Sequence, residues 1–324
     1  MNARDKYPDA FLNVNEARLN AAEQLLASFN KKDMTDWARE CTVTQELGHQ
    51  SFRMLVSRGE DESKVLFAGG ELGNGLDALG ALARIRVIRE IVEPSATIVY
   101  QPNSTMTENN VNFSKPEQNL LKHGNGSPLT DRIIKTFDSI GAPKEIIAYG
   151  PSQGGMVALA LAADNNTPAM ALAAVEIPNI TNRGRLKMAR DFAGAGSSLK
   201  ENIGMNFDRD AQFHDDLIDG LSAKLLIGYG LGLMKEDNLR LVDIMGKNTA
   251  EAQMRTNLEK GGSIVHAWAT GDTVSPHADN KVISTHLSGI PRYEHATFKG
   301  DHSITNIYLL NAALVHRAAF LMNN

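Results

Sequence analysis

The stretch AYGPSQGG, residues 148–155, places a serine between glycines where an apolar run meets a run of small residues. The preceding EIIAYG predicts a buried strand, and the following GMVALALAAD predicts a helix. The pentapeptide GPSQG at 150–154 matches G-x-S-x-G, a pattern that holds a nucleophilic serine on a sharp turn between strand and helix. Its glycines leave room for the strand and the helix to approach each other. We therefore predict that Ser152 is a catalytic nucleophile, with a simple glycine-rich turn as the alternative.

A nucleophilic serine needs a base, and the base needs a carboxylate that orients it. In a strand–turn–helix architecture the acid and then the histidine follow the serine along the chain, each at the end of a later strand. Asp272 follows the predicted strand SIVHAWAT, and His302 follows the predicted strand RYEHATFK. We therefore predict Asp272 as the orienting acid and His302 as the base.

Other histidines and acids fit these positions less well. The rival histidines, which lie inside predicted strands or on a predicted connecting helix, are His266, His277, His286 and His295. Asp301 is expected to be a supporting group or a helix cap. Asp243 or Asp237 could replace Asp272 only if the acid had moved into the stretch 181–260.

A second glycine-rich loop follows the predicted strand KVLFAGG. Its segment GNGLDA at 73–78 fits the dinucleotide fingerprint G-x-G-x-x-G/A, but the fingerprint strand should run straight into the first glycine, and here other residues intervene. The loop suits another use, because a backbone N–H after this strand completes an oxyanion hole beside a nucleophilic serine. We predict Gly70 or Glu71 as that donor, with the N–H of Gln153 as the second donor.

The order of predicted elements indicates an α/β fold. Apolar residues at helical spacing begin the chain, two strands follow around Gly48, and strands then alternate with helices. The alternation stops in a helical, loop-rich stretch and resumes near residue 263. Repeated βα units imply a mostly parallel sheet covered by helices on both faces. The predicted parts are an N-terminal helical segment at 1–40, an α/β core at 41–180 and 261–324, and a helical insertion at 181–260.

Composition excludes several classes of function. The chain has 324 residues, of which 42% are hydrophobic and 22% charged, as in ordinary globular proteins. A net charge of −5 leaves no basic footprint for nucleic acid. Cys41 alone cannot form an intrachain disulfide, which is compatible with a reducing compartment. The polar N-terminus is not a secretory signal, and no run approaches the roughly 20 apolar residues of a membrane span, so we expect a cytoplasmic protein.

Metal chemistry has little support in the sequence. Asp272, Asp301 and His302 bring acids and a histidine together, but the chain has no H-E-x-x-H pattern and no Cys/His spacing. We expect neither a metal nor a cofactor.

The segments YGPSQGG, TGDTVSP and KGDHSIT together resemble the α/β-hydrolase superfamily, whose nucleophile, acid and histidine occur in this order. The resemblance covers about residues 41–322 and implies an α/β-hydrolase fold, with a mostly parallel central sheet flanked by helices. The insertion at 181–260 falls where the family often carries a helical cap. The string SQGG is similar to that of carboxylesterase and acyl-thioesterase members. One departure is AGG at 68–70, where many members carry His-Gly.

The resemblance implies a serine hydrolase that cleaves a carboxylic ester or thioester of a small-molecule acyl substrate without a cofactor. The insertion would roof the site; an extra helical layer packed on the core is the alternative. Its apolar residues include Met188, Leu199, Met205, Leu231, Met234 and Met245. A binding or scaffold protein with this fold and an NAD(P)-dependent oxidoreductase are the competing classes. The amphipathic residues 1–40 fit packing on the domain, formation of a homo-oligomer, or docking of a partner.

Overall fold

The central sheet is built from strands that run through the whole chain. The computed structural model describes residues 2–59, 63–71, 78–102, 112–193, 198–207, 212–217 and 236–324. In these residues the sheet has eight strands in the order β1-β2-β4-β3-β5-β6-β7-β8. The strands are β1 (Thr42–Leu47), β2 (Gln50–Ser57), β3 (Lys64–Gly69), β4 (Ala96–Tyr100), β5 (Glu145–Pro151), β6 (Met170–Val175), β7 (Ser263–Ala269) and β8 (Tyr293–Phe298). β2 pairs antiparallel with β1 and β4, and all other neighbours are parallel, which confirms the predicted mostly parallel sheet.

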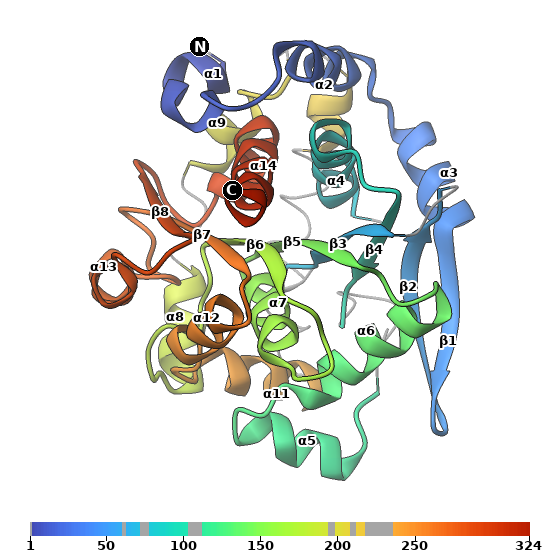
Figure 1. Cartoon of the computed structure of the whole chain (residues 1–324), viewed down its shortest axis with the longest axis vertical. Helices are drawn as coiled ribbons and strands as arrows, with labels where there is room; N and C mark the ends of the chain where they lie inside the picture. The colour runs from blue at the N-terminus through green and yellow to red at the C-terminus, as the bar shows by residue number, and fades with distance from the viewer. Residues whose placement is uncertain are drawn as a thin grey trace.

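The middle strands are buried because helices cover both faces of the sheet (Figure 1). Successive side chains of a strand point to opposite faces. In β3, Leu66 and Ala68 accordingly pack into one apolar cluster, while Val65 and Phe67 pack into the other. The covering helices are α4 (Leu79–Val92) and α14 (Tyr308–Asn323) on one face, with α2 (Glu16–Ser28) packed on α4 beyond them, and α6 (Ser127–Ser139), α7 (Gln153–Ala163), α12 (Ala250–Glu259) and α13 (His277–Leu287) on the other. Outside these layers lie α5 (Lys115–Lys122) and α11 (Glu236–Met245).

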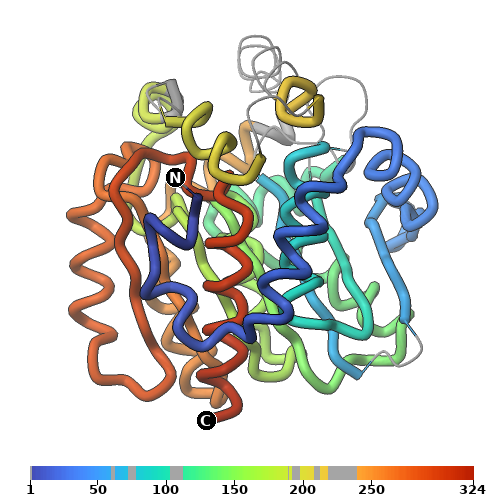
Figure 2. The backbone as a smooth tube through the Cα atoms, turned by 90° about the horizontal axis from the view of Figure 1, so that it is seen from above, coloured from blue at the N-terminus to red at the C-terminus, as the bar shows by residue number. Residues whose placement is uncertain are grey.

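The N-terminal segment packs on the domain, along α4 and α14 (Figure 2). It contains α1 (Ala3–Lys6), η1 (Pro8–Phe11), α2 and α3 (Lys31–Cys41). On α2, Leu19 and Leu26 are buried, and Arg18 donates a hydrogen bond to the Ile91 carbonyl at 3.1 Å. Of the three uses expected for this segment, the structure shows packing on the domain.

The stretch 181–260 divides into two parts. Its earlier helices, α8 (Arg185–Ala193) and α9 (Leu199–Ile203), lie at the upper edge of the molecule in Figure 2. Its last helix, α12, belongs to the layer beside α7. There the Asn257 side chain accepts from the Met170 N–H and donates to the Met170 carbonyl, both at 3.0 Å. Met188 and Met245 are buried in the same core cluster as α12, while Leu231 and Met234 lie outside the described residues.

Among the described residues, no helix is both long enough and apolar enough to cross a bilayer.

His266 is a fully buried histidine in the middle of β7. Its Nε2 lies 2.8 Å from the Asn280 Oδ1, and its Nδ1 lies 3.2 Å from the Tyr293 hydroxyl. Burial lowers the pKa of His266 to about 3, although the bond to Asn280 opposes this shift. The folded protein therefore holds a neutral imidazole at a site where the unfolded chain would bind a proton below pH 6.5.

We expect His266 to make the protein less stable in acid. Because the folded pKa lies below the unfolded one, its contribution falls as the pH drops through 6.5, by about 2 kcal/mol between pH 7 and pH 5. Urea unfolding at the two pH values should show this loss in the unmutated protein and in a control with the exposed His49 changed to Gln. The loss should shrink by about that amount in His266→Gln. An unchanged pH dependence in His266→Gln would contradict the assignment.

Candidate active site

Ser152 stands at the turn between β5 and α7 with a backbone that side-chain-bearing residues rarely adopt. Its φ is 49° and its ψ is −123°. The Ser152 N–H donates to the Val175 carbonyl of β6 at 2.8 Å, and the Ser152 carbonyl accepts from the Gly155 N–H at 2.9 Å. The neighbouring strand and the first turn of α7 thus hold this conformation.

The glycines around Ser152 are required by close backbone contacts. A Cβ atom on Gly150 would lie 2.4 Å from the Gly155 Cα. A Cβ atom on Gly154 would lie 2.5 Å from the backbone of Gly69, at the end of β3. The turn brings β5, α7 and the end of β3 together so closely that no side chain fits between them.

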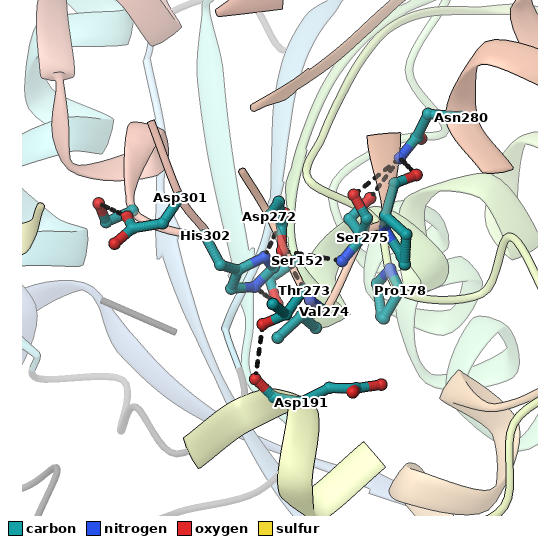
Figure 3. Close-up of polar contacts among 12 residues, drawn as sticks. Ser152, Pro178, Asp191, Asp272, Thr273, Val274, Ser275, Asn280, Asp301 and His302 are labelled. Carbon is teal, nitrogen blue, oxygen red and sulfur yellow. Dashed lines mark hydrogen bonds and ion pairs between the residues drawn. The ribbon is translucent and has the colours of Figure 1, made fainter. Parts of the chain in front are cut away.

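Three predicted site residues lie in one hydrogen-bonded row (Figure 3). The His302 Nε2 is 2.9 Å from the Ser152 Oγ, and the His302 Nδ1 is 2.7 Å from the Asp272 Oδ2. Asp272 follows β7, and His302 lies between β8 and η2 (Ile304–Asn306). Parallel strands bring their carboxyl ends to one edge of the sheet, which is why residues so distant in sequence meet here.

The Asp272 carboxylate is held by its own loop. Its Oδ1 accepts hydrogen bonds from the N–H groups of Val274 at 2.7 Å and Ser275 at 2.9 Å. Together with His302, these are three donors directed at one buried carboxyl group. These three bonds fix the orientation of the Asp272 carboxylate against the His302 ring.

The electrostatic setting of His302 is dominated by two opposing effects. Burial lowers the pKa of His302, whereas the Asp272 carboxylate, aided by Glu71 and Asp301, raises it. The net pKa lies above the ordinary histidine value of 6.5. His302 therefore binds a proton more readily than a free imidazole does, as a general base should.

The first predicted oxyanion donor, the Gln153 N–H, belongs to the first residue of α7 and so has no carbonyl partner within the helix. Of the two residues predicted for the other donor, Gly70 donates its N–H to the Tyr100 carbonyl at 2.9 Å. Glu71 is fixed at its carbonyl by the Gln101 side chain at 2.8 Å and at its carboxylate by Arg84 at 3.2 Å. Because the Gly70 N–H is already bonded to the Tyr100 carbonyl, Glu71 is favoured over Gly70 as the second oxyanion donor.

The rival residues lie elsewhere in the structure. His295 stacks on Trp268, the His277 Nδ1 accepts from the Trp268 indole at 2.9 Å, and His286 contacts Glu251 at 3.1 Å. Asp243 forms ion pairs with Arg185 and Arg240. Asp301 accepts from the Ser198 N–H at 2.7 Å and from the Ser303 hydroxyl, and so fastens the start of α9. The side chain of Asp237 and the fingerprint positions 73–77 lie outside the described residues.

Sequence reasoning missed two residues at the site. Glu176, directly after β6, is fully buried, and its carboxylate lies within 4.8 Å of ligand-type atoms of Asp272 and His302. This spacing could suit a metal ion, but the hydrogen bonds of Asp272 and His302 already occupy the atoms that a metal would need. The signal for Glu176 was an acid at the end of a buried strand, the same signal that identified Asp272.

The second missed residue is Arg183, whose buried guanidinium joins the stretch 181–260 to the loop after Asp272. It pairs with Asp191 of α8 at 2.9 Å and donates to the carbonyls of Thr273 at 3.3 Å and Val274. The Thr273 hydroxyl in turn donates to the Asp191 carbonyl at 2.8 Å (Figure 3). No local sequence pattern signals this long-range contact.

The row of hydrogen bonds predicts how the His302 proton titrates. We expect NMR titration of His302 to give a pKa above 6.5. Asp272→Asn should lower that pKa, because it removes the negative charge that stabilises the imidazolium. Asp279→Asn on α13 is the control and should leave the titration unchanged. A His302 pKa that does not respond to Asp272→Asn would contradict the described contact.

Comparison with known proteins shows similarity in structure alone. No protein-family model matches the chain, and no curated protein sequence does. A bromoperoxidase from Bacillus anthracis superposes with a TM-score of 0.56 at 12% identity, covering 87% of this chain and 100% of that one. An enol-lactonase from Burkholderia xenovorans gives 0.52 at 13% identity, covering 87% and 100%. A carboxylesterase structure from the thaumarchaeon Nitrososphaera gargenis gives 0.51 at 13% identity, covering 82% and 92%.

These three structures superpose over 82–87% of this chain and over nearly their whole length, with TM-scores above 0.5. Their sequence identity is too low to carry an activity over, and it supports the architecture only. The chain has the α/β-hydrolase fold.

Proposed function

We propose that the chain is a serine hydrolase that cleaves a carboxylic ester or thioester through an acyl-enzyme. The observation that carries this proposal is the row from Asp272 through His302 to Ser152, with the serine held on a strained turn. Nucleophile, base and orienting acid are each within hydrogen-bond distance of the next, which is the geometry that activates a hydroxyl group.

In the acylation step the Ser152 Oγ attacks the carbonyl carbon while the His302 Nε2 takes its proton. The resulting imidazolium lies against the Asp272 carboxylate at Nδ1, which stabilises its positive charge and fixes the ring. When the tetrahedral intermediate collapses, the carbon–oxygen or carbon–sulfur bond breaks, and the departing alcohol or thiol takes the proton from Nε2. The acyl group remains on the Ser152 Oγ.

The oxyanion of the tetrahedral intermediate needs two donors near Ser152. The Gln153 N–H at the start of α7 provides one, aided by the positive end of the helix dipole. We assign the second to the Glu71 N–H, because Gly70 uses its own N–H on Tyr100. In the deacylation step a water gives a proton to His302 Nε2 and attacks the acyl carbon. The bond from that carbon to the Ser152 Oγ then breaks, and the Oγ takes the proton back from Nε2, which releases the acid and restores Ser152.

The earlier part of the stretch 181–260 is the proposed cap. It is fastened to the site at two points, because Ser198 before α9 donates to Asp301, and Arg183 before α8 binds the loop after Asp272. A cap so placed would border the substrate and select the acyl group.

Only some of the structural neighbours are named for the cleavage of esters. One is a carboxylesterase and one an enol-lactonase, whereas the bromoperoxidase carries a different name on the same fold. Because one fold hosts several activities, the proposal rests on the site and not on the neighbours. A cytoplasmic location, expected from the sequence, remains a prediction, and a homo-oligomer remains one of the uses open to residues 1–40.

We expect the protein to hydrolyse short- or medium-chain p-nitrophenyl esters and to be labelled at Ser152 by a fluorophosphonate. Ser152→Ala should abolish labelling and lower kcat by about 10⁴-fold or more, and His302→Ala should have an effect of similar size. Ser28→Ala, on α2, is the matched control and should keep both properties. Folded protein that neither hydrolyses esters nor takes the label would instead be a binding or scaffold protein. Stabilisation by NAD(P) would favour the oxidoreductase class.

The pH dependence of kcat/KM should follow His302, which acts only when neutral. Because the pKa of His302 is raised above 6.5, kcat/KM should fall as the pH drops through a value above 6.5. The measurement is a pH–rate profile at substrate concentrations well below KM. An acidic limb below pH 6.5 would mean that another group is the base.

A further inference from the structure

Glu176 is a buried acid that the proposed mechanism does not use. It follows β6 directly, its side chain is completely buried, and its φ of 54° turns the chain away from the sheet. Its N–H still donates to the Ala267 carbonyl of β7 at 2.8 Å. The backbone therefore fixes Glu176 at the same edge of the sheet as the site.

The carboxyl group of Glu176 lies among ionisable groups from several elements. One of its oxygens is within 4.8 Å of a carboxylate oxygen of Asp272 and of a ring nitrogen of His302. The Glu71 carboxylate also raises the pKa of Glu176, and Glu71 is itself paired with Arg84 at 3.2 Å. Ionising Glu176 would therefore place a second negative charge in a buried space that already holds the Asp272 carboxylate.

The two carboxyl groups differ in their hydrogen-bond donors. Asp272 receives bonds from two backbone N–H groups and from His302. In the described part of the chain, neither carboxylate oxygen of Glu176 accepts a hydrogen bond of normal length and angle. The N–H groups of Thr305 and Ile304 face it and favour its charged form. Burial and the charge of Asp272 act in the opposite direction and raise the pKa of Glu176 well above its usual range.

We propose that Glu176 and Asp272 form a carboxyl pair that carries one negative charge and one proton, with the charge on Asp272 and the proton on Glu176. Two carboxylates in one dry site cannot both be ionised cheaply, and the donors decide which of them keeps the charge. Glu176 then acts on the reaction only through the pKa of His302. Its effect is on His302, because a second carboxylate would stabilise the imidazolium and leave the base protonated at neutral pH.

The protonation of Glu176 can be tested without any assay of activity. Infrared spectra of the full-length protein in heavy water at neutral pH should contain the C=O band of a protonated carboxyl group. The band should disappear in Glu176→Gln, a replacement of nearly the same shape. Glu71→Gln is the control, because Glu71 is a second, partly buried glutamate near the site whose pKa, despite the opposing effect of burial, is lowered by its ion pair with Arg84. That variant should keep the band.

The charge state of Glu176 can also be measured through its effect on the pKa of His302. Replacing a neutral carboxyl by a neutral amide should leave the NMR titration of His302 at the same pH in Glu176→Gln. If Glu176 were ionised, Glu176→Gln would remove a negative charge and lower the pKa of His302. A lowered His302 pKa, or the absence of the infrared band from the unmutated protein, would overturn the proposal.

If Glu176→Gln does not fold, a second measurement on the unmutated chain tests the proposal. Labelling glutamate carboxyl carbons with ¹³C should shift the protonated band at neutral pH, where exposed glutamates, with a pKa of about 4.3, are ionised. A band that does not shift would belong to another residue and would overturn the proposal. The role in tuning a general base rests on the proposed function, but these readouts do not. A protein with the band and without ester hydrolysis would refute the hydrolase assignment and leave the carboxyl pair intact.

Discussion

The backbone of Ser152 is the constraint on which the rest of the site depends. A non-glycine residue at φ 49° and ψ −123° costs about 1–3 kcal/mol, and it persists only where the surroundings leave no alternative. Here β6 holds its N–H, the first turn of α7 holds its carbonyl, and glycine contacts with β3 close the space around it. The hydroxyl group is thereby raised above the carboxyl edge of the sheet, where the loops after β7 and β8 bring Asp272 and His302. A relaxed turn would lower the hydroxyl and separate it from the imidazole.

Most acidic groups near this turn are paired with an opposite charge or with hydrogen-bond donors. Glu71 is paired with Arg84, whose guanidinium also donates to the Thr305 carbonyl at 2.7 Å. Asp272 receives three donors, and Asp301 receives a backbone N–H and a hydroxyl. Among the described residues, Glu176 accepts no hydrogen bond of normal geometry and has only the facing N–H groups of Thr305 and Ile304, and the proposed proton on it follows from that difference. The imidazole of His302 thus contacts one ionised carboxylate directly, that of Asp272, which together with Glu71 and Asp301 raises its pKa against the effect of burial.

Much of this arrangement could be predicted from the sequence because short stretches of neighbouring residues indicate it. The elbow around Ser152 lies between an apolar strand and a helix, and Asp272 and His302 mark the ends of later strands. The residues that were missed depend on contacts that local patterns do not contain. Glu176 lies within MALAAVEIPNI (170–180), whose apolar character continues past Val175 and so obscures the end of β6 at that residue. Choosing between Gly70 and Glu71 needed the bond from Gly70 to Tyr100. By contrast, the start of α5 is marked locally, by the capping box that Ser114 and Glu117 form.

The most direct test of the account is to trap the covalent intermediate itself. The protein is mixed with a p-nitrophenyl ester, quenched in acid within the first turnover, digested, and analysed by mass spectrometry. The account predicts one acyl group on the peptide that contains Ser152, formed together with a burst of p-nitrophenol equal to the enzyme concentration. Ester turnover with no acyl group on Ser152, or with the acyl group on another residue, would contradict it.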